Sequence, residues 1–257
     1  MYNFSEKEMV KINQAKELEK ISTRYGISYC LAGDDLYPKE MSRLKNMPPL
    51  LYYKGNIEVI NKCKNVAVIG SRKLSEAGKQ LSYYTGEAVA KEGLNLVNGL
   101  ALGCDTEAIK GALAAGGRCI AVMPCGLQEV QPKSNQKLAE EILEKGGCLL
   151  SEYPVGTGVQ KYQYVERDRL QSGISQGVLV IEAEKTSGTM HTADFAARQF
   201  KRLGYYYYKL LESSSGNRYL EETSKAQVLK TKADLLKFIE NIKKEEVYEQ
   251  IKFDFSC

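Results

Sequence analysis

The chain has 257 residues, of which 43% are hydrophobic and 26% charged, and its formal net charge is +4. That length allows one large or two small domains with a sizeable core, and the composition is typical of a soluble globular protein. The small basic excess permits a polyanionic partner but does not demand one.

Several protein classes are excluded by what the sequence lacks. No run approaches about 18 apolar residues, and the N-terminal residues lack the apolar core of a signal peptide. The seven cysteines are scattered without a CxxC pair, and His191 is the one histidine. We therefore expect a cytoplasmic protein with reduced thiols, cysteines that mostly fill the core, and no metal or cofactor.

The N-terminal residues are predicted to form a small helical preface. Apolar residues recur there at helical spacing: Ile12, Ala15, Leu18 and Ile21. Pro48 and Pro49 then force an extended path that ends in a turn at residues 55–56, and we interpret this stretch as a connector laid against the main domain. The predicted boundary separates the preface, residues 1–45, from a main domain over residues 46–257.

From residue 65 onward, strand-like and helix-like segments alternate. Strands are expected at 65–70, 94–98, 118–123, 147–151, 177–182, 205–210 and 226–230. Helices are expected near 76–92, 105–115, 134–145, 163–174 and 189–202. Alternation at this spacing predicts an α/β fold with a doubly wound, mostly parallel sheet. In such a sheet, ligands bind outside the carboxyl ends of the strands.

The C-terminal part of the main domain is predicted to be a helix and an apolar tail. The helix lies near 232–247, and one face of it carries Leu235, Leu236, Ile239 and Ile242. The tail, residues 251–257, could dock on the body or on a partner. The tyrosine run at 205–208 suits a strand by propensity, although a platform for stacking nucleic-acid bases is a second interpretation.

The stretch from Asn65 to Arg72 predicts an anion site. Its apolar run is typical of a buried parallel strand, and Gly70 allows a ligand to approach the backbone closely. Ser71 and Arg72 follow, and a helix begins near Ser75. Backbone amides and the helix dipole favour negative charge there, and Arg72 adds a forked cation suited to a phosphate. An ordinary turn with a surface arginine is the alternative.

Other strand ends carry similar features. Gly99 and Gly103 bracket a turn before Asp105, which we expect to cap the next helix, and Gly126 follows the third strand. After the fifth strand, Glu182 precedes a second segment with the features of an anion site at a helix start: Ser187, Gly188 and Thr189. Two such sites on one sheet edge indicate a phosphate-bearing ligand.

Aromatic residues and cations alternate between Lys161 and Arg169. This composition is expected of a groove for single-stranded nucleic acid. The alternative is a solvated helix face on which Glu166 and Asp168 pair with Arg167 and Arg169. We expect His191 to be packed or solvent-facing rather than catalytic.

In order along the chain, these segments resemble the DprA family (DNA-processing protein A), also called Smf. The matching residues lie between about 37 and 240 and share one series of motifs: Tyr37-Pro38, Pro49 to Asn56, Val68 to Arg72, Gly99 to Ala101 with Gly103 and Asp105, Cys125 to Leu127, Leu150 to Pro154, Arg167 with Arg169, Glu182-Ala183, Ser187 to Thr189, and Gly216-Asn217. The ordered series is far more specific than any one of its members.

The resemblance implies an extended Rossmann-like fold and no enzymatic reaction. It implies a homodimer that binds single-stranded DNA in a basic pocket and delivers it to the recombinase RecA, as in natural transformation. By resemblance, Gly70, Ser71 and Arg72 hold a backbone phosphate. Arg167 and Arg169 line or shape the same pocket, and Lys161 lies in the loop before it.

The sequence departs from the family pattern at several positions. Leu102 stands in place of a cation, Glu107 in place of a histidine and Asp168 in place of an asparagine, and we expect no winged-helix domain. Two other functions stay open. One is a nucleotide-sensing module of a defence system. The other is a phosphoribohydrolase resembling the LOG enzymes, whose loop is partly echoed by Glu182 and residues 187–189.

Overall fold

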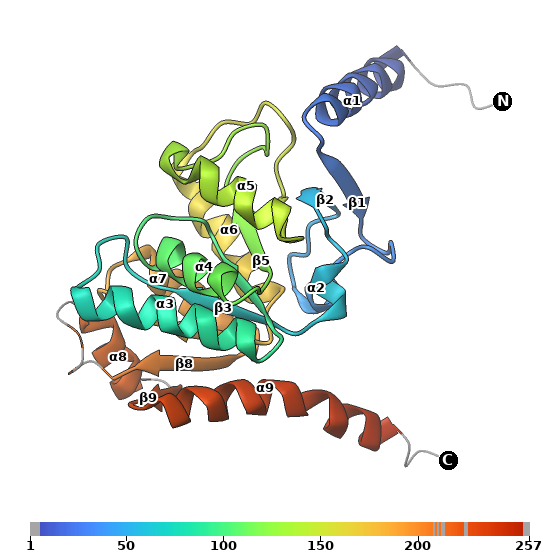
Figure 1. Ribbon diagram of the computed structural model, residues 1–257. Helices are drawn as coiled ribbons and strands as arrows, with labels where there is room; N and C mark the ends of the chain where they lie inside the picture. Colours follow the sequence, from blue (N-terminus) through green and yellow to red (C-terminus); the bar gives the residue numbers. More distant parts are fainter. Residues whose placement is uncertain (1–5, 208, 210, 212–213, 224–225, 254–257) are drawn as a thin grey trace.

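The computed structural model describes residues 6–253 except 208, 210, 212–213 and 224–225 (Figure 1). Among these residues, one sheet has the strand order β1-β2-β6-β5-β4-β3-β7-β8-β9. The strands are β1 Ser28–Leu31, β2 Leu50–Gly55, β3 Asn65–Ile69, β4 Asn95–Asn98, β5 Cys119–Met123, β6 Cys148–Ser151, β7 Gly177–Val180, β8 Arg202–Tyr206 and β9 Gln227–Leu229.

Helices cover both faces of this sheet. They are α1 Glu6–Arg24, α2 Val59–Lys62, α3 Glu76–Lys91, α4 Cys104–Ala114, α5 Gln136–Glu144, α6 Lys161–Gly173, α7 Gly188–Arg198, α8 Ser215–Thr223 and α9 Lys232–Phe253, with short 3₁₀ helices η1 Lys39–Arg43 and η2 Lys133–Asn135. Buried residues of α3, α4, α5 and α9 pack in one core cluster, and those of α2, α6, α7 and α8 pack in another.

The two clusters meet the sheet through alternate residues of the same strand. In β3, Val66 and Val68 belong to the first cluster and Ala67 and Ile69 to the second. Every residue of β3, β4, β5, β6 and β7 is buried. A parallel strand with helices on both faces has no solvated side, which explains the continuous apolar run predicted to be buried.

The path of the chain reverses at β3. From β3 the chain proceeds to β4, β5 and β6 on one side, and β7, β8 and β9 then extend the sheet on the other. All pairings from β3 to β9 are parallel, and both antiparallel pairings involve β2. The predicted doubly wound, mostly parallel, Rossmann-like sheet is confirmed. Its switch point lies between β3 and β7, where such folds bind ligands.

The N-terminal residues are only partly helical. Helices α1 and η1 fit the predicted preface, but residues 28–31 form β1, which pairs antiparallel with β2. The predicted connector was wrong, because Leu50–Gly55 is a strand that pairs with β6. Leu51 is fully buried there while its neighbours are partly exposed, as in a strand near a sheet edge. The two prolines precede the strand, where no ladder amide is required.

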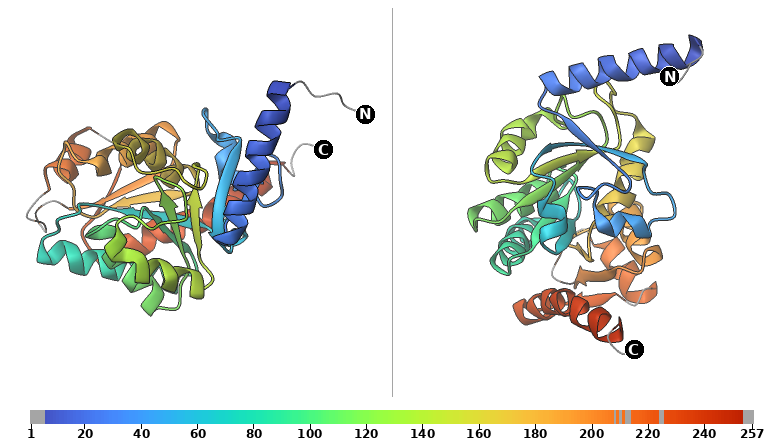
Figure 2. Two further views of the ribbon diagram at one scale, coloured as in Figure 1. Left: turned by 90° about the horizontal axis from the view of Figure 1, so that it is seen from above. Right: turned by 90° about the vertical axis from the view of Figure 1, so that its right-hand side faces the viewer.

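The C-terminal helix is longer than predicted. Figure 2 shows α9 at one end of the molecule and α1 at the other. Leu235, Ile239 and Ile242 are buried, but the expectation for Leu236 was wrong: it is 37% exposed because one residue turns about 100° around a helix. Residues 254–257 of the tail lie outside the described residues.

The sixth predicted strand begins and ends earlier than expected. Strand β8 spans Arg202–Tyr206, so two of the four tyrosines lie in it and are buried. Tyr208 lies outside the described residues. No helix in the described part of the chain is long and apolar enough to cross a membrane.

Candidate functional site

A cleft of about 510 Å³ opens at the carboxyl ends of β3 and β7, the switch point of the sheet. We call it the strand-end cleft. Its lining residues are Ile69, Gly70, Ser71, Arg72, Ala101, Asp105, Lys161, Tyr164, Arg167, Asp168, Gln171, Ser187, Gly188, Thr189 and Thr192. Residues from four separate stretches of sequence therefore meet in one site.

The turn after β3 is held tightly against the neighbouring segments. Ser71 donates its amide to the Glu182 carbonyl at 2.7 Å, and Cys104 donates its amide to the Ser71 carbonyl at 3.1 Å. A side chain at Gly70 would meet the Cys104 sulfur at 2.8 Å. Gly103 has φ of 74° and lies against the backbone of residues 71–72, so glycine is required there for both conformation and space.

The predicted anion site at the start of α3 is already occupied by the protein itself. Ser75 caps α3, and its amide and hydroxyl donate to Glu182 Oε2 at 3.0 and 2.9 Å. A methyl group at Gly78 would overlap the same carboxylate. Glu182 is fully buried and does not line the cleft, so its carboxylate is an anion that the protein itself supplies to this helix start.

The start of α7 remains accessible. Ser187 is the N-cap residue, but its hydroxyl donates to the Glu184 carbonyl at 2.7 Å and caps no amide of the helix. Gly188 and Thr189 line the cleft beside it. A helix start attracts negative charge through its amides and dipole, so this end of the cleft suits an anion.

One face of α6 forms the opposite wall. The lining residues Lys161, Tyr164, Asp168 and Gln171 are three or four positions apart, which places them on one helical face. Tyr164 and Gln171, together with Thr192 of α7, were not predicted to be site residues. The helical spacing from Lys161 was a sufficient signal for the first two.

Two arginines stack on the Tyr164 ring. The Arg72 guanidinium carbon lies 5.1 Å from the ring centroid and that of Arg167 lies 6.0 Å from it. Arg72 is exposed, whereas Arg167 is only 5% exposed. Cation–π attraction therefore holds both guanidinium groups beside the same ring.

Arg167 is built into the floor of the cleft. Its Nη1 donates to the Val122 carbonyl at 3.0 Å, and its Nε lies 3.2 Å from Asp168 Oδ1. A methyl group at Gly99 would overlap the guanidinium, which explains the glycine at that position. Gly99 itself therefore makes room for a cation and does not line the strand-end cleft.

Two buried carboxylates face these cations. Burial raises the pKa of Asp168 to about 6, although the nearby Arg167 opposes the shift. Burial also raises the pKa of Asp105, against the effect of Arg167 and of the Ala101 and Gly99 amides that donate to it. The cleft thus holds three cations and two acids. The prediction that Asp105 caps α4 was wrong, because Gly103 occupies the N-cap position.

Several predicted site residues lie elsewhere. Arg169 is two positions from Arg167 and therefore on another side of α6, where its Nη2 donates to Glu152 at 2.8 Å and its Nε to Glu166 at 3.0 Å. This is the pairing that the alternative interpretation expected for Arg169. Gly126 is buried against Pro154 and also does not line the cleft.

Of the three departures from the family pattern, only Asp168 lines the strand-end cleft. Leu102 is 47% exposed in a small adjoining pocket, and Glu107 pairs with Lys110 at 2.8 Å. His191 is solvent-exposed, as expected. Five of the six described cysteines are buried, which confirms their core role, and no cluster of metal-binding side chains occurs among the described residues.

The fold and the cleft define an α/β protein of the extended Rossmann-like class, with a cleft lined by three cations at the switch point of its sheet. The profile of the family DNA recombination-mediator protein A matches residues 28–240, and the chain belongs to this family. The ordered motifs of the sequence had indicated the same family.

Curated relatives agree with this assignment. Protein Smf of Escherichia coli is 36% identical over 168 residues, which cover 65% of this chain and 45% of that protein. DNA processing protein DprA of Streptococcus pneumoniae is 37% identical over 166 residues, which cover 65% and 58%. The chain therefore matches only about half the length of these relatives.

Two solved structures have the same fold. DprA of Streptococcus pneumoniae superposes with a TM-score of 0.74 at 31% identity, covering 85% of this chain and 77% of that one. DprA of Helicobacter pylori, whose structure was described in terms of its single-stranded DNA binding mode, gives 0.75 at 30% identity and covers 86% and 98%.

Proposed function

We propose that this chain binds single-stranded DNA in the strand-end cleft and acts as a recombination mediator. The observation that carries the proposal is the position of Arg72. It stands at the switch point of the sheet, stacked on Tyr164, and is exposed to solvent beside the open start of α7. A phosphate lying between them meets a forked cation and helix amides together. The H. pylori relative's single-stranded DNA binding supports the choice of ligand.

The cleft suits backbone recognition better than base reading. Its cations are Arg72, Lys161 and Arg167, and Tyr164 offers an aromatic face. Basic grooves with aromatic side chains bind single strands with little sequence preference. Because such binding releases counterions, affinity should decrease as salt rises.

The direct test is fluorescence anisotropy with a labelled oligothymidylate at increasing salt. We expect the dissociation constant to rise steeply between about 50 and 200 mM salt, since each phosphate contact adds to the slope. A dissociation constant that stays level over this range would contradict the proposal. An oligonucleotide of mixed sequence serves as the control and should bind with similar affinity.

We further propose that the protein is not an enzyme. The alternative phosphoribohydrolase reaction needs an accessible carboxylate, and Glu182 is buried beneath the start of α3 and bonded to Ser75. Incubation with AMP should therefore release no free base. Release that disappears in Glu182→Gln would overturn this part of the proposal.

The nucleotide-sensing alternative is favoured by one observation: Asp105 and Asp168 reduce the positive charge of the cleft, which a small ligand tolerates better than a long polyanion. A thermal-shift panel of nucleotides beside the oligonucleotide titration separates the two. Stabilisation by one nucleotide without oligonucleotide binding would favour the sensor.

Delivery of the strand to RecA, a homodimeric state and a cytoplasmic location complete the proposal, on the basis of family membership. Sedimentation of the purified chain tests the dimer. A RecA filament-assembly assay on single-stranded DNA, with and without this protein, tests delivery. Faster assembly is the expected result, and an unchanged rate would contradict it.

A further inference from the structure

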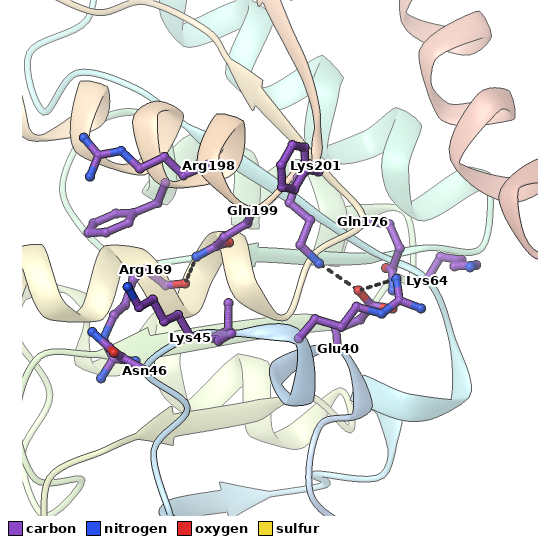
Figure 3. A pocket seen from close by; sticks show the side chains of 13 residues that line it. Glu40, Lys45, Asn46, Lys64, Arg169, Gln176, Arg198, Gln199 and Lys201 are labelled. Atoms are coloured by element: carbon purple, nitrogen blue, oxygen red, sulfur yellow. Dashed lines mark hydrogen bonds and ion pairs between the residues drawn. The ribbon is translucent and has the colours of Figure 1, made fainter.

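A second cavity, of about 660 Å³, lies at the other end of α7 (Figure 3). We call it the basic pocket. Its lining residues are Glu40, Arg43, Leu44, Lys45, Asn46, Lys64, Arg169, Gln176, Phe195, Arg198, Gln199, Phe200 and Lys201. It is bounded by the segment from η1 to residue 46 and by the ends of α6 and α7, and it shares no lining residue with the strand-end cleft.

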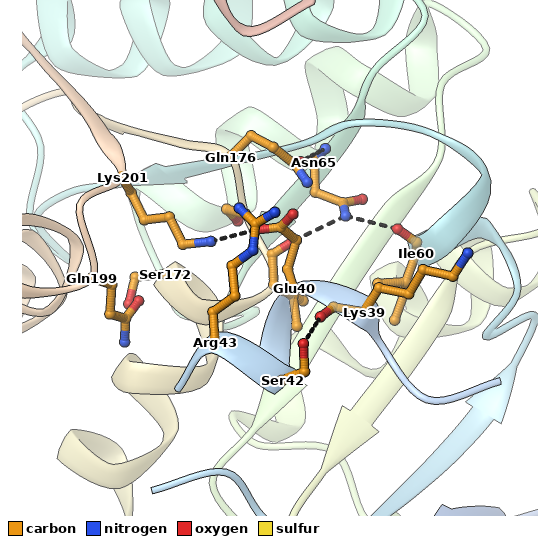
Figure 4. Close-up of polar contacts among 12 residues, drawn as sticks. Lys39, Glu40, Ser42, Arg43, Ile60, Asn65, Ser172, Gln176, Gln199 and Lys201 are labelled. Atoms are coloured by element: carbon orange, nitrogen blue, oxygen red, sulfur yellow. Dashed lines mark hydrogen bonds and ion pairs between the residues drawn. The ribbon is translucent and has the colours of Figure 1, made fainter. Parts of the chain in front are cut away.

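The basic pocket has a surplus of positive charge. Six of its lining residues are cations and only Glu40 is an acid. Lys201 pairs with Glu40 at 2.7 Å, as Figure 4 shows, and Arg169 pairs with Glu152 and Glu166, which lie outside the lining. Lys45 and Arg198 have no ion-pair partner among the described residues and are exposed.

Two buried polar atoms of the pocket lack partners among the described residues. Arg169 Nη1 is a donor and Gln199 Oε1 is an acceptor, and each is buried without a hydrogen bond. Gln199 uses its other side-chain atom, Nε2, to donate to the Arg169 carbonyl at 3.1 Å. An unsatisfied buried donor and acceptor cost free energy that a polar ligand in the pocket would recover.

Phe200 at the rim is held in an unusual position. Its amide bonds the Ala197 carbonyl at 3.2 Å and the Lys201 amide bonds the Ala196 carbonyl at 2.9 Å, which is the motif that normally ends a helix with glycine. Phe200 has φ of 57°, a left-handed conformation unfavourable for an aromatic residue. The residue is 97% exposed and gains no packing in return.

We propose that the basic pocket is a second binding site, for a phosphorylated nucleotide unit. Lys45, Arg198 and the free Nη1 of Arg169 receive the phosphate, and the exposed Phe200 ring stacks on the base. The volume lies within the range of small-ligand sites. Aromatic rings at the edge of a basic groove bind bases in this way. The unit comes either from a free nucleotide or from a single strand, which share this chemistry, and the site does not depend on the strand-end cleft.

The test uses two variants of the pocket and one matched control. Lys45→Glu combined with Arg198→Glu reverses two exposed charges, and Phe200→Gly removes the ring while suiting the left-handed backbone. Lys137→Glu is the control, because Lys137 is exposed on α5, across the sheet from the pocket. All should fold, since none of these side chains is buried.

Binding is measured by anisotropy with a labelled oligothymidylate and by calorimetry with AMP. For the strand, we expect the double charge reversal to weaken binding at least tenfold and to reduce the salt slope by about 1.4, two phosphate contacts at 0.7 each. The control should change the affinity less than twofold. For a free nucleotide, AMP binding should be lost in the double variant and kept in the control.

An abasic oligonucleotide of the same charge isolates the role of Phe200. Phe200→Gly should weaken binding of the oligothymidylate several-fold and leave binding of the abasic strand unchanged. If the double variant binds the oligothymidylate and AMP as tightly as the wild type does, the basic pocket is not a nucleotide site. The same conclusion follows if the wild type binds neither ligand. Loss of strand binding in Arg72→Ala alone would then leave the strand-end cleft as the DNA site.

Discussion

The strand-end cleft and the basic pocket lie at opposite ends of α7 and differ in how they hold charge. In the cleft, Arg167 is buried with Asp105 and Asp168, so the cations there are largely balanced by acids. In the basic pocket, six cations surround one acid, and Lys45 and Arg198 are exposed. Buried charges must be paired because they have lost their hydration, whereas exposed charges need no partner.

This difference predicts a division of roles between structure and binding. Charges of the cleft floor should contribute strongly to folding stability, and charges of the basic pocket should contribute mainly to ligand affinity. Arg72 is the exception within the cleft. It is exposed and contacts the Tyr164 ring, so we expect its loss to affect ligand affinity more than folding stability.

Arg167→Ala should have the largest effect on stability. The change leaves two buried carboxylates without their cation, and we expect a loss of about 3–5 kcal/mol in the free energy of unfolding. Urea denaturation followed by circular dichroism measures it. Lys45→Ala is the control and should stay within about 0.5 kcal/mol of wild type. A loss of similar size in both would show that the two sites do not differ in this way.

Arg72→Ala should weaken oligonucleotide binding by about 1–3 kcal/mol, the range for a charge-assisted hydrogen-bonding group. Arg72→Lys should restore only part of the affinity, because an ammonium cannot make a forked contact. Melting temperatures should change little, since Arg72 is exposed. Wild-type affinity in Arg72→Ala would show that the strand binds elsewhere, with the basic pocket as the first candidate.

Asp168→Asn should strengthen oligonucleotide binding by about 1 kcal/mol, because it removes a negative charge near the phosphate. In the wild type, where the pKa of Asp168 is about 6, binding should tighten as pH falls from 7 to 5. The variant should lose most of this dependence. Anisotropy titrations of both proteins across this range provide the measurement, and parallel pH curves would contradict the prediction.

The same carboxyl group also affects folding, with a definite sign. The folded protein keeps the Asp168 proton up to about pH 6, whereas an unfolded chain releases it near the ordinary value of 3.8. Between these values the folded state binds more protons, so its contribution to the free energy of unfolding decreases as pH rises and is level above about 6. Denaturation of wild type and Asp168→Asn at several pH values should show a flatter curve for the variant.

Phe200→Gly should have the smallest effect on stability. The ring makes no packing contact that would be lost, and glycine removes the cost of the left-handed backbone. Phe200→Ala keeps that cost, so the glycine variant should be more stable than the alanine variant by about 1 kcal/mol. Thermal melts of the two variants test this. Equal stability would mean that the backbone relaxes in the alanine variant.

The core of the fold and the family could both be predicted from local sequence patterns. The apolar run from Val66 to Ile69 predicted a strand buried on both faces, and the alternation of strands and helices implied a parallel sheet. Such a sheet places Gly70 and Gly188 at the same edge, so the location of the strand-end cleft followed from local patterns and the topology rule.

Contacts between distant segments determine which helix start borders an open cleft. Glu182 and Ser75 are 107 positions apart, and no local pattern reveals that this carboxylate occupies the start of α3. The same holds for the pairing of β1 and β2, whose short, half-exposed sequences resemble loops until a partner strand is present. Long-range contacts of this kind are absent from any window of sequence.

Helix α6 illustrates both what local sequence predicts and what packing adds. Helical spacing alone groups Lys161 with Tyr164 and separates Arg167 from Arg169, and it could have assigned the two arginines to different sites. Which face meets the cleft depends on how α6 packs against β5 and α7, because only that packing buries Arg167 and leaves Arg169 at the basic pocket. Sequence determines the faces of a helix, and packing determines what each face contacts.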